Sequence, residues 1–245
     1  CYNISNKAQG LSIKEIIMQR FLYGVIFFIL LSISLAGTGW AVSDGIKLYK
    51  VGEVSVWAIA DSISERNMSV FPEARPEIIM EYMPLGKAPS SIMAFVLQTD
   101  DSIILVDTGL GDPAGYALTG LDAAGFKPAE ISLVLLTPFH SDHIGGLLTE
   151  DGQKVFPSAK ILSSRAEQAY WLDYDTMLAN PERIANFEAA RKLAEVYGDN
   201  FQAFDFNKNI LSGIKALDAS GHTPGHTAFL MESKGDKLLL WGDLV

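Results

Sequence analysis

Short apolar runs, each closed by turn residues, follow one another along the chain from Lys47 onward. Such runs, bounded by Gly, Pro, Asn or Asp, predict strands. The run SLVLLT at 132–137 lacks polar alternation, which is typical of a strand buried on both faces. The predicted strands cover 54–60, 91–98, 102–107, 132–137, 227–232 and 237–241, with one more around Leu217.

Three segments with helical composition lie between these strands, at 113–124, 165–172 and 181–197. The last has Asn180 as its expected N-cap, Pro181 as its first residue and Gly198 at its end. The segment 62–87 is poor in strand signals, so we expect a flap or a plain connecting loop there. Strands that alternate in part with helices predict a layered fold of the α/β or α+β class.

The beginning of the chain has the composition of a targeting segment. The apolar run 21–35 is shorter than the roughly 20 residues of a comfortable membrane span. It follows Met18 and Arg20 and precedes small residues at Gly39 and Ala41, which is the pattern of a signal peptide. We therefore expect a periplasmic or secreted protein, and the alternative is a membrane anchor formed by an uncleaved signal. The predicted division is upstream translation at 1–17, a signal peptide at 18–41 and one domain at 42–245.

Composition excludes several classes of function. With 49% hydrophobic residues the chain is not a disordered protein. The formal net charge of −10 disfavours binding to nucleic acid through phosphates. Cys1 is the single cysteine, so neither an intramolecular disulfide nor a cysteine zinc ribbon can form. The four histidines fall in two short clusters, and this concentration directs attention to metal chemistry.

Polar residues of catalytic type follow four predicted strands. Strand ends that meet at one edge of a sheet commonly build a site, and imidazole with carboxylate is a metal-ligand combination. Each motif alone is also compatible with a capping or turn role, but the four together favour a metal site. The motifs are Asp107 after SIILV, His140-Ser141-Asp142-His143 after SLVLLT, Gly221-His222-Thr223-Pro224-Gly225-His226 after the strand of Leu217, and Gly242-Asp243 after KLLLW.

These motifs resemble those of the metallo-β-lactamase fold superfamily. LLTPFHSDHIGG is similar to its H-x-H-x-D-H motif, and ILVDTG, GHTPGH and WGD are similar to its other motifs, in the same order. FPSAKILSSRAEQAYW and GHTPGHTAFLMES resemble the secreted methyl parathion hydrolase and lactonase-like members. The resemblance implies an α+β fold, the αβ/βα four-layer sandwich, incomplete at the C-terminus, with a two-metal site between its sheets.

The resemblance also implies roles for individual residues. His140 and His222 match ligands of a first metal, Asp142 and His143 match ligands of a second, and Asp243 matches the carboxylate that bridges them. The ions implied are two zinc ions, with manganese or iron as alternatives. Asp142 is also implied as the catalytic residue that orients the nucleophile and carries a proton.

Three further residues match positions that support the site without ligating. Asp107 and His226 are of this kind, and Thr223, with Pro224, is expected to shape the turn that aims His222. Two departures from the family pattern stand beside these matches. Pro138 occupies the place of the first motif histidine, and the family's final histidine has no counterpart before Val245.

The implied activity is hydrolysis of an ester, lactone or phosphotriester by a metal-bound hydroxide, with a small molecule as substrate. No nucleic-acid partner is expected, membrane contact is expected only through the signal peptide, and a homodimer is an open alternative. Two other functions remain open. Pro138 allows a metal-impaired, non-catalytic member of the fold, and GHTPGH also fits a glyoxalase II-like thioesterase, although a signal peptide disfavours a cytosolic substrate.

Overall fold

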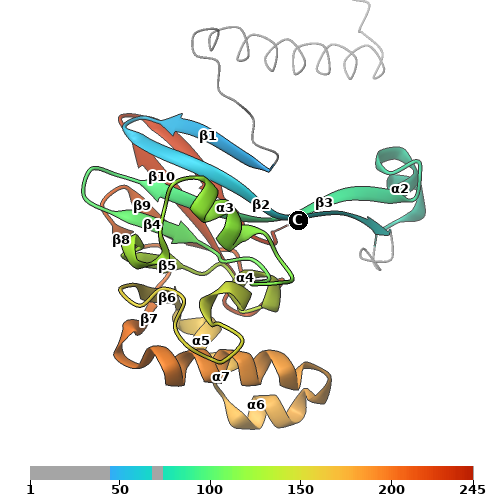
Figure 1. Cartoon of the computed structure of the whole chain (residues 1–245). Coiled ribbons are helices and arrows are strands. Elements are labelled where there is room, and N and C mark those ends of the chain that lie inside the picture. The colour runs from blue at the N-terminus through green and yellow to red at the C-terminus, as the bar shows by residue number, and fades with distance from the viewer. Residues whose placement is uncertain (1–44, 68–73, 245) are drawn as a thin grey trace, which may run out of the picture. The chain divides into compact units, whose positions relative to one another are not determined.

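A computed structural model describes residues 45–67 and 74–244 of the chain (Figure 1). The predicted upstream segment 1–17 and signal peptide 18–41 lie outside the described residues, so both stay predictions. Within the described part, no helix is long and apolar enough to cross a membrane.

The described strands form two sheets. One has seven strands in the order β1-β2-β3-β4-β5-β6-β7, and the other has four in the order β11-β10-β9-β8. In the larger sheet, β1 to β4 pair antiparallel and β4 to β7 pair parallel. The strands are β1 Ile46–Val51, β2 Val54–Asn67, β3 Lys87–Gln98, β4 Ile103–Val106, β5 Leu133–Leu135, β6 Lys160–Ser164, β7 Phe201–Phe204, β8 Asn209–Leu211, β9 Ile214–Asp218, β10 Thr227–Ser233 and β11 Asp236–Leu240.

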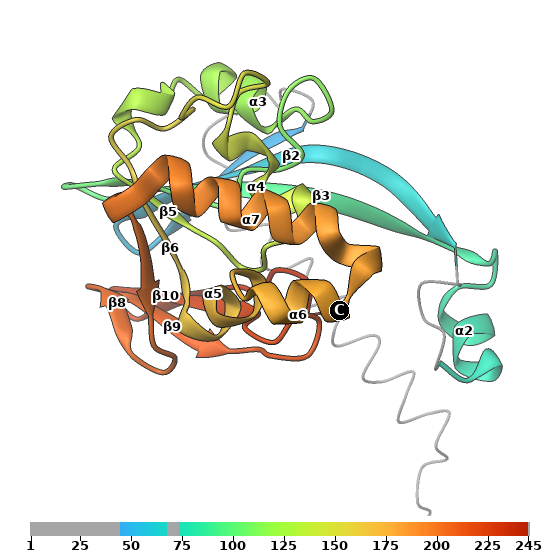
Figure 2. The same cartoon turned by 90° about the horizontal axis from the view of Figure 1, so that it is seen from below.

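The described helices lie mainly between the parallel strands and after them. Figure 2 shows α3 on one side of the larger sheet and β8, β9 and β10 on the other. The helices are α2 Pro76–Tyr82, α3 Ala117–Ala123, α4 Ser141–Ile144, α5 Arg165–Trp171, α6 Tyr174–Ala179 and α7 Ile184–Tyr197. This arrangement of helices and two sheets confirms the mixed fold class. A helix layer outside the smaller sheet, which the four-layer prediction requires, is not among residues 45–67 and 74–244.

Two apolar clusters hold the layers together. Leu105 and Val134 point from the larger sheet toward the helices, where they join Trp171 and Phe187. Their strand neighbours, such as Leu135, point the other way and pack against the smaller sheet. Because successive side chains alternate between faces, β4 and β5 are buried on both sides. This explains why their sequences are continuous apolar runs.

In the segment 62–87 the described residues include strand and helix, so the prediction of a plain connecting loop was wrong, while the alternative of a flap is not contradicted. β2 continues to Asn67, β3 begins at Lys87, and the two pair up to that point. Figure 1 shows the pair reaching away from the sheet as an arm with α2 at its end. Residues 63–67 are exposed, so no apolar alternation marks them. Backbone pairing with β3 makes them a strand, and pairing leaves no hydrophobic pattern in the sequence.

Two helix starts also differ from the prediction. Asn180 makes no capping bond; its side-chain amide instead donates to Thr176 O at 2.7 Å. A 3₁₀ turn over Pro181–Arg183 follows, and α7 begins only at Ile184. Helix α3, predicted over 113–124, begins only at Ala117. The residues before it are held in a loop by buried Asp61, whose carboxylate accepts hydrogen bonds from Leu110 N at 3.0 Å and Ala117 N at 2.7 Å.

Candidate metal centre

Six of the eight predicted site residues line one cleft of about 1080 Å³, and the other two, Thr223 and His226, do not. They come from loops after β4 and β5, from the loop between β9 and β10, and from the end of β11. A smaller hollow of about 500 Å³ beside Asp112 contains no histidine, so the chemistry belongs to the larger cleft. Each hollow is lined by both polar and apolar residues. Of the two, only the larger cleft is lined by the candidate ligands His140, Asp142, His143, His222 and Asp243.

The first histidine cluster folds as a short helix at the end of β5. His140 is extended, with φ −76° and ψ 154°, and stands just before α4. His143 N donates to His140 O at 3.0 Å, which closes the first turn. Gly111 and Gly145 let this turn approach the loop after β4, because a Cβ on Gly111 would lie 2.3 Å from Gly145 O. The local sequence therefore presents His140, Asp142 and His143 within four residues of one tight turn.

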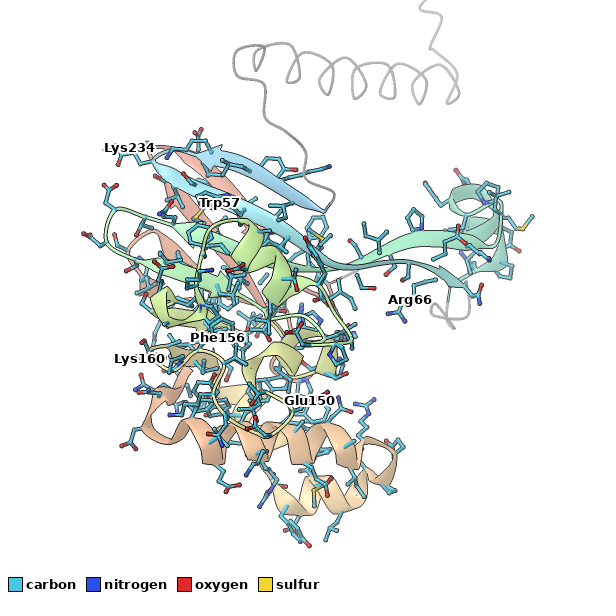
Figure 3. All side chains as sticks on the ribbon, viewed as in Figure 1. Trp57, Arg66, Glu150, Phe156, Lys160 and Lys234 are labelled. Carbon is cyan, nitrogen blue, oxygen red and sulfur yellow. The ribbon has the colours of Figure 1, made fainter. Side chains whose placement is uncertain are left out.

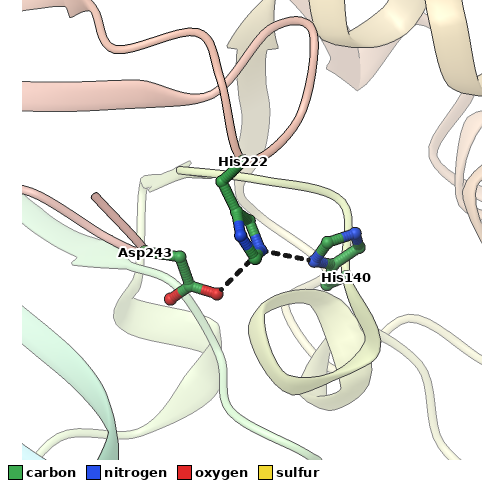
Figure 4. Close-up of side chains that lie close together, drawn as sticks. All are labelled: His140, His222 and Asp243. Atoms are coloured by element: carbon green, nitrogen blue, oxygen red, sulfur yellow. Dashed lines mark hydrogen bonds and ion pairs between the residues drawn. The ribbon is translucent and has the colours of Figure 1, made fainter. Parts of the chain in front are cut away.

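The first candidate ligand group is His140, His222 and Asp243 (Figure 4). His222 Nε2 lies 2.9 Å from His140 Nδ1 and 3.1 Å from Asp243 Oδ2. The ligand atoms of all three residues lie within 4.8 Å of one another. Nitrogen and carboxylate oxygen at this spacing can share one divalent ion. These residues are separated by as much as 103 positions in sequence, so only the fold brings them together.

The second candidate group is Asp142, His143 and Asp243. His143 is 5% exposed, and its Nε2 lies 3.2 Å from Asp243 Oδ1 and 3.8 Å from Asp142 Oδ2. Neither contact has the geometry of a hydrogen bond, so this buried nitrogen has no hydrogen-bond partner among the described residues. A buried polar atom without a partner is costly, and a metal ion would satisfy it. Asp243 belongs to both groups, which is the arrangement that the resemblance implies.

Asp107 contacts the Nδ1 side of the His143 ring, opposite the nitrogen that faces Asp243. It is 4% exposed and has a positive φ of 57°, which turns its carboxylate toward α4. The Oδ2 atom lies 2.9 Å from His143 Nδ1, and Thr137 donates to the same carboxylate through its N at 2.9 Å and its Oγ1 at 2.6 Å. A carboxylate on one ring nitrogen orients the other toward a metal. Asp107 therefore lies where a supporting residue would lie, beside the site but outside both ligand groups.

His226 has both ring nitrogens engaged within the protein. It is fully buried, its Nδ1 lies 3.0 Å from Ala219 O, and its Nε2 accepts from Asp243 N at 3.0 Å. Gly242 packs directly on this ring, since a Cβ there would lie 2.6 Å from His226 Nε2. The geometry places His226 as a support for the backbone of Asp243.

Thr223 leads to a residue that sequence analysis did not single out. Its Oγ1 donates to Glu167 Oε2 at 2.7 Å, and Gly225 N donates to the same oxygen at 2.8 Å. Glu167 Oε1 accepts from Phe139 N and from Trp171 Nε1, each at 2.8 Å. Glu167 is 1% exposed, so a buried carboxylate joins the two histidine loops. The one sequence signal was the pair Ser164 and Glu167, which has the spacing of a helix capping box.

The electrostatics of the site favour divalent cations. Burial alone would lower the pKa of His143, but the carboxylates of Asp107 and Asp243 outweigh it and raise the pKa to about 11. Burial would raise the pKa of Asp243, but His143 and His222 hold that pKa well below its usual range. Burial, together with His222, lowers the pKa of His140 to about 4. Burial also lowers the pKa of His226. The Asp243 carboxylate, which both groups share, is therefore anionic, and the His140 imidazole is neutral, at neutral pH.

Pro138 is buried beside this site and supplies no donor atom. Each candidate group therefore has three protein donors among the described residues, with Asp243 shared. The unpartnered Nε2 of His143 and the facing nitrogens of His140 and His222 fit a pair of divalent ions. The residues present thus suit the two-metal centre, although the His140 group has one histidine fewer than the family pattern.

Comparison with known proteins defines the family. A family model described as the metallo-beta-lactamase superfamily matches residues 88–245. The chain therefore belongs to the metallo-beta-lactamase superfamily, which confirms the resemblance found in the motifs. The fold of this superfamily carries a dinuclear metal site, and the two ligand groups of the cleft have that form.

Named relatives of the chain are hydrolases. An N-acyl homoserine lactonase of Bacillus cereus is 22% identical over 178 residues, which cover 61% of this chain and 61% of that protein. A protein of Mycobacterium tuberculosis named as a probable metallo-hydrolase is 25% identical over 209 residues, covering 72% of this chain and 66% of that protein. The chain thus spans about three fifths of the length of the lactonases it matches.

Solved structures agree with this placement. AidC, a dizinc quorum-quenching lactonase in complex with a product, superposes with a TM-score of 0.70 at 27% identity, covering 80% of this chain and 73% of AidC. The hydrolase AbOPH superposes with a TM-score of 0.71 at 28% identity, covering 85% of this chain and 76% of AbOPH. Both share the fold and the superfamily, so the chain's architecture is that of lactonase-like metallo-hydrolases.

Proposed function

We propose that the protein is a hydrolase that uses two zinc ions to cleave small esters and lactones. The observation that carries this proposal is the convergence of His140, His222, Asp243, Asp142 and His143 in one cleft. His140, His222 and Asp243 would hold one ion, and Asp142, His143 and Asp243 would hold the other. When bound, the ions supply Lewis acidity that polarises the scissile bond and activates water.

The chain's own residues would orient the reactants. Asp142 is partly exposed to the cleft, with 26% of its side chain accessible, so its carboxylate can accept a hydrogen bond from the attacking water. The same carboxylate can then pass the proton to the leaving oxygen. Asp107 holds the His143 ring, and His226 holds the backbone of Asp243.

The lining of the cleft supports a small substrate with an apolar part. Ile92, Met93 and Phe95 of β3 line the cleft, and so do Leu238 and Leu240 of β11 and Trp241 directly after it. Ser90, Ser91 and Arg66 of the arm add polar groups, and Figure 3 labels Arg66 near the outer end of β2. Apolar walls with a few polar groups are typical of small-molecule sites. Lactones come first because the B. cereus relative and AidC are lactonases; phosphotriesters remain a second substrate class to test.

We also propose that the chain is exported, because residues 18–41 have the composition of a signal peptide. Membrane contact would then be limited to that segment. Fractionation of cells that express the full chain, with detection in the periplasm or the medium, tests this proposal. Retention in the cytosol would contradict it.

The hydrolase proposal is tested with the purified full chain. Bound metal is counted by elemental analysis, and turnover is measured on an N-acyl homoserine lactone, an aryl ester, a phosphotriester and a glutathione thioester. We expect two zinc ions per chain and turnover that stops with a chelator and returns with zinc. Preference for the glutathione thioester would favour the glyoxalase II-like function instead.

Pro138 supports one alternative, a member of the fold that binds its ligands without turnover. Because the proline side chain has no metal-binding atom, the His140 group has three candidate protein ligands. Under this alternative the chain would hold one ion or none and would cleave none of the four substrates. Two bound ions with chelator-sensitive turnover would exclude it.

A further inference from the structure

We infer that Glu167 is the positioning residue for the His140 and His222 pair, acting on both loops from inside the core. The inference rests on the proposed function in one respect, namely that these histidines ligate a metal. Glu167 lies on α5, touches neither ligand group and does not line the cleft. Its effect on the site must therefore pass through the loops that it holds.

One oxygen of Glu167 controls the His140 side. Oε1 accepts from Phe139 N at 2.8 Å, and Phe139 is the residue directly before His140. The same oxygen accepts from Trp171 Nε1 at 2.8 Å. The Trp171 ring in turn packs edge-on against the His140 imidazole, with centroids 5.6 Å apart. Glu167 thus sets both the backbone next to His140 and the ring against which His140 rests.

The other oxygen controls the His222 side. Oε2 accepts from Thr223 Oγ1 at 2.7 Å and from Gly225 N at 2.8 Å. Ser164 adds a third tie, because its Oγ donates to Gly225 O at 2.6 Å. A Cβ on Gly225 would lie 2.0 Å from Glu167 N, so the loop sits directly on the start of α5. The turn that carries His222 is therefore fastened to α5 at both its backbone and its side chain.

The bonding of this carboxylate is complete. A carboxylate only accepts hydrogen bonds and has about four acceptor positions, and four donors occupy them here. In an ordinary capping box the glutamate would bond to the N-cap backbone of its own helix. Ser164 does accept from Glu167 N at 3.0 Å, but the Glu167 carboxylate bonds to the two histidine loops instead. Helix α5 therefore lacks the capping-box bond from the glutamate side chain, and that side chain links the two histidine loops.

Each half of the site then has its own buried carboxylate. Asp107 bonds to His143 Nδ1 and so orients the ligand of the second group. Glu167 orients the loops of His140 and His222, the group in which Pro138 replaces a histidine. Metal binding depends on how precisely the ligands are held in place, and the bonds of Glu167 go to the residues beside His140 and His222. Loss of Glu167 should therefore weaken the first group and spare the second.

The test measures metal binding by Glu167→Gln, with zinc stoichiometry and affinity as readouts. Glutamine places an amide group where two donors point, so one loop loses its acceptor. We expect the first ion to bind about 10- to 100-fold more weakly, the range found when partners of metal ligands are removed. Binding of the second ion should stay unchanged.

Two further variants separate positioning from general stability. Tyr197→Phe removes another buried hydrogen bond, in which the Tyr197 hydroxyl donates to Leu147 O at 2.9 Å; Tyr197 belongs to neither ligand group and does not line the cleft. It should lower the melting temperature without changing either ion. Thr223→Val removes a single bond to Glu167 and keeps the size of the side chain, so it tests the link if Glu167→Gln fails to fold. It should weaken binding of the first ion and leave binding of the second unchanged.

Backgrounds with one group removed assign the effect. In a His143→Ala chain, only the first group remains, and Glu167→Gln should weaken the remaining ion. In a His222→Ala chain, Glu167→Gln should change nothing further. Equal weakening of both ions, or none, would overturn the inference. If the unaltered chain itself binds no metal, the proposed function has failed instead, so the two failures are distinguishable.

Discussion

At the scale of single residues, the site is prepared before any ion binds. Asp107 holds Nδ1 of His143, which leaves Nε2 free toward Asp243. Both ring nitrogens of His226 are hydrogen-bonded to backbone atoms, Nδ1 to Ala219 O and Nε2 to Asp243 N. Because orientation is set by neighbours, ligand and supporting residues can be told apart by which ring nitrogen is free. Three predictions follow from these contacts.

His226→Ala should weaken metal binding without removing an ion. The change leaves the part-buried Asp243 N without its acceptor, which costs about 1 kcal/mol of folding free energy. Thermal unfolding would show this loss, and elemental analysis should still find the metal content of the unaltered chain. A loss of one ion would instead make His226 a ligand.

Pro138→His should strengthen the first metal site. The resemblance places a ligand histidine at this position, and an added imidazole would complete a group that now has three donors. We expect zinc affinity to rise by about tenfold or more, the effect of roughly 1.4 kcal/mol. A titration with a competing chelator measures this. Pro138→Ala is the control, since it removes the ring and adds no donor.

Zinc binding should release a proton at pH 8. The pKa of His143 is about 11 without metal, because the carboxylates of Asp107 and Asp243 overcome burial, so the ring is protonated at that pH. A ligating imidazole must be neutral, so the ion displaces the proton and zinc affinity rises with pH. Calorimetry in buffers of different ionisation enthalpy counts the protons released. No proton release with His143 present would contradict the expected coupling.

At the scale of elements, the site is made by strand ends and by glycines that bring them close. Asp243 follows β11, and Gly242 before it has a φ of 56°. A Cβ on Gly242 would lie 2.6 Å from His226 Nε2 and 2.7 Å from Thr137 Cβ. The end of β11 can therefore pass between these two side chains only as glycine, and this passage delivers Asp243 to both ligand groups.

Gly242→Ala should both destabilise the fold and displace Asp243. The residue carries a left-handed φ and a steric conflict, whereas Gly235 in the β10–β11 turn carries a φ of 90° with nothing within 4 Å. Gly235→Ala is therefore the matched control for backbone strain alone, which costs about 1 kcal/mol. Thermal melts and zinc titrations should show a larger loss in both for Gly242→Ala. Equal losses would mean that the close approach has no effect.

At the scale of the whole molecule, the metal site joins the two sheets. His140, Asp142 and His143 follow β5 of the larger sheet, while His222 and Asp243 belong to loops of the smaller one. The apolar cluster between the sheets brings the loops near one another, and charged ligands then face across the rim. Ions bound there would link the sheets at the edge where packing ends.

Removal of metal should lower the melting temperature. A ligand present at about 100 times its dissociation constant stabilises the native state by about 2.7 kcal/mol. For a domain of this size, each kcal/mol shifts the melting temperature by about 2–4 °C. Calorimetric scans before and after a chelator, and after zinc is restored, measure the shift. An Asp243→Asn chain, which alters both groups, should show a much smaller response.

The amino-acid sequence determined the buried strands, the family and the members of the candidate site. Continuous apolar runs identified β4 and β5 because burial on both faces leaves no other pattern. The motifs at 140–143, 222–226 and 243 contain the residues of both ligand groups. The arm of β2 and β3 went unseen, because its strands are exposed and are held by backbone pairing that side-chain pattern does not record.

The role of Glu167 was decided only by the tertiary structure. Three of its four hydrogen-bond donors lie 28, 56 and 58 positions away in the sequence. The fourth, Trp171, lies four residues further along the chain. Hydrophobic periodicity and capping motifs report contacts within a few residues, and they place Glu167 at the start of a helix. Which distant donors a buried carboxylate meets depends on how the layers pack. The sequence therefore named the candidate ligands and three of their supporting residues, whereas the fold alone revealed the link through Glu167.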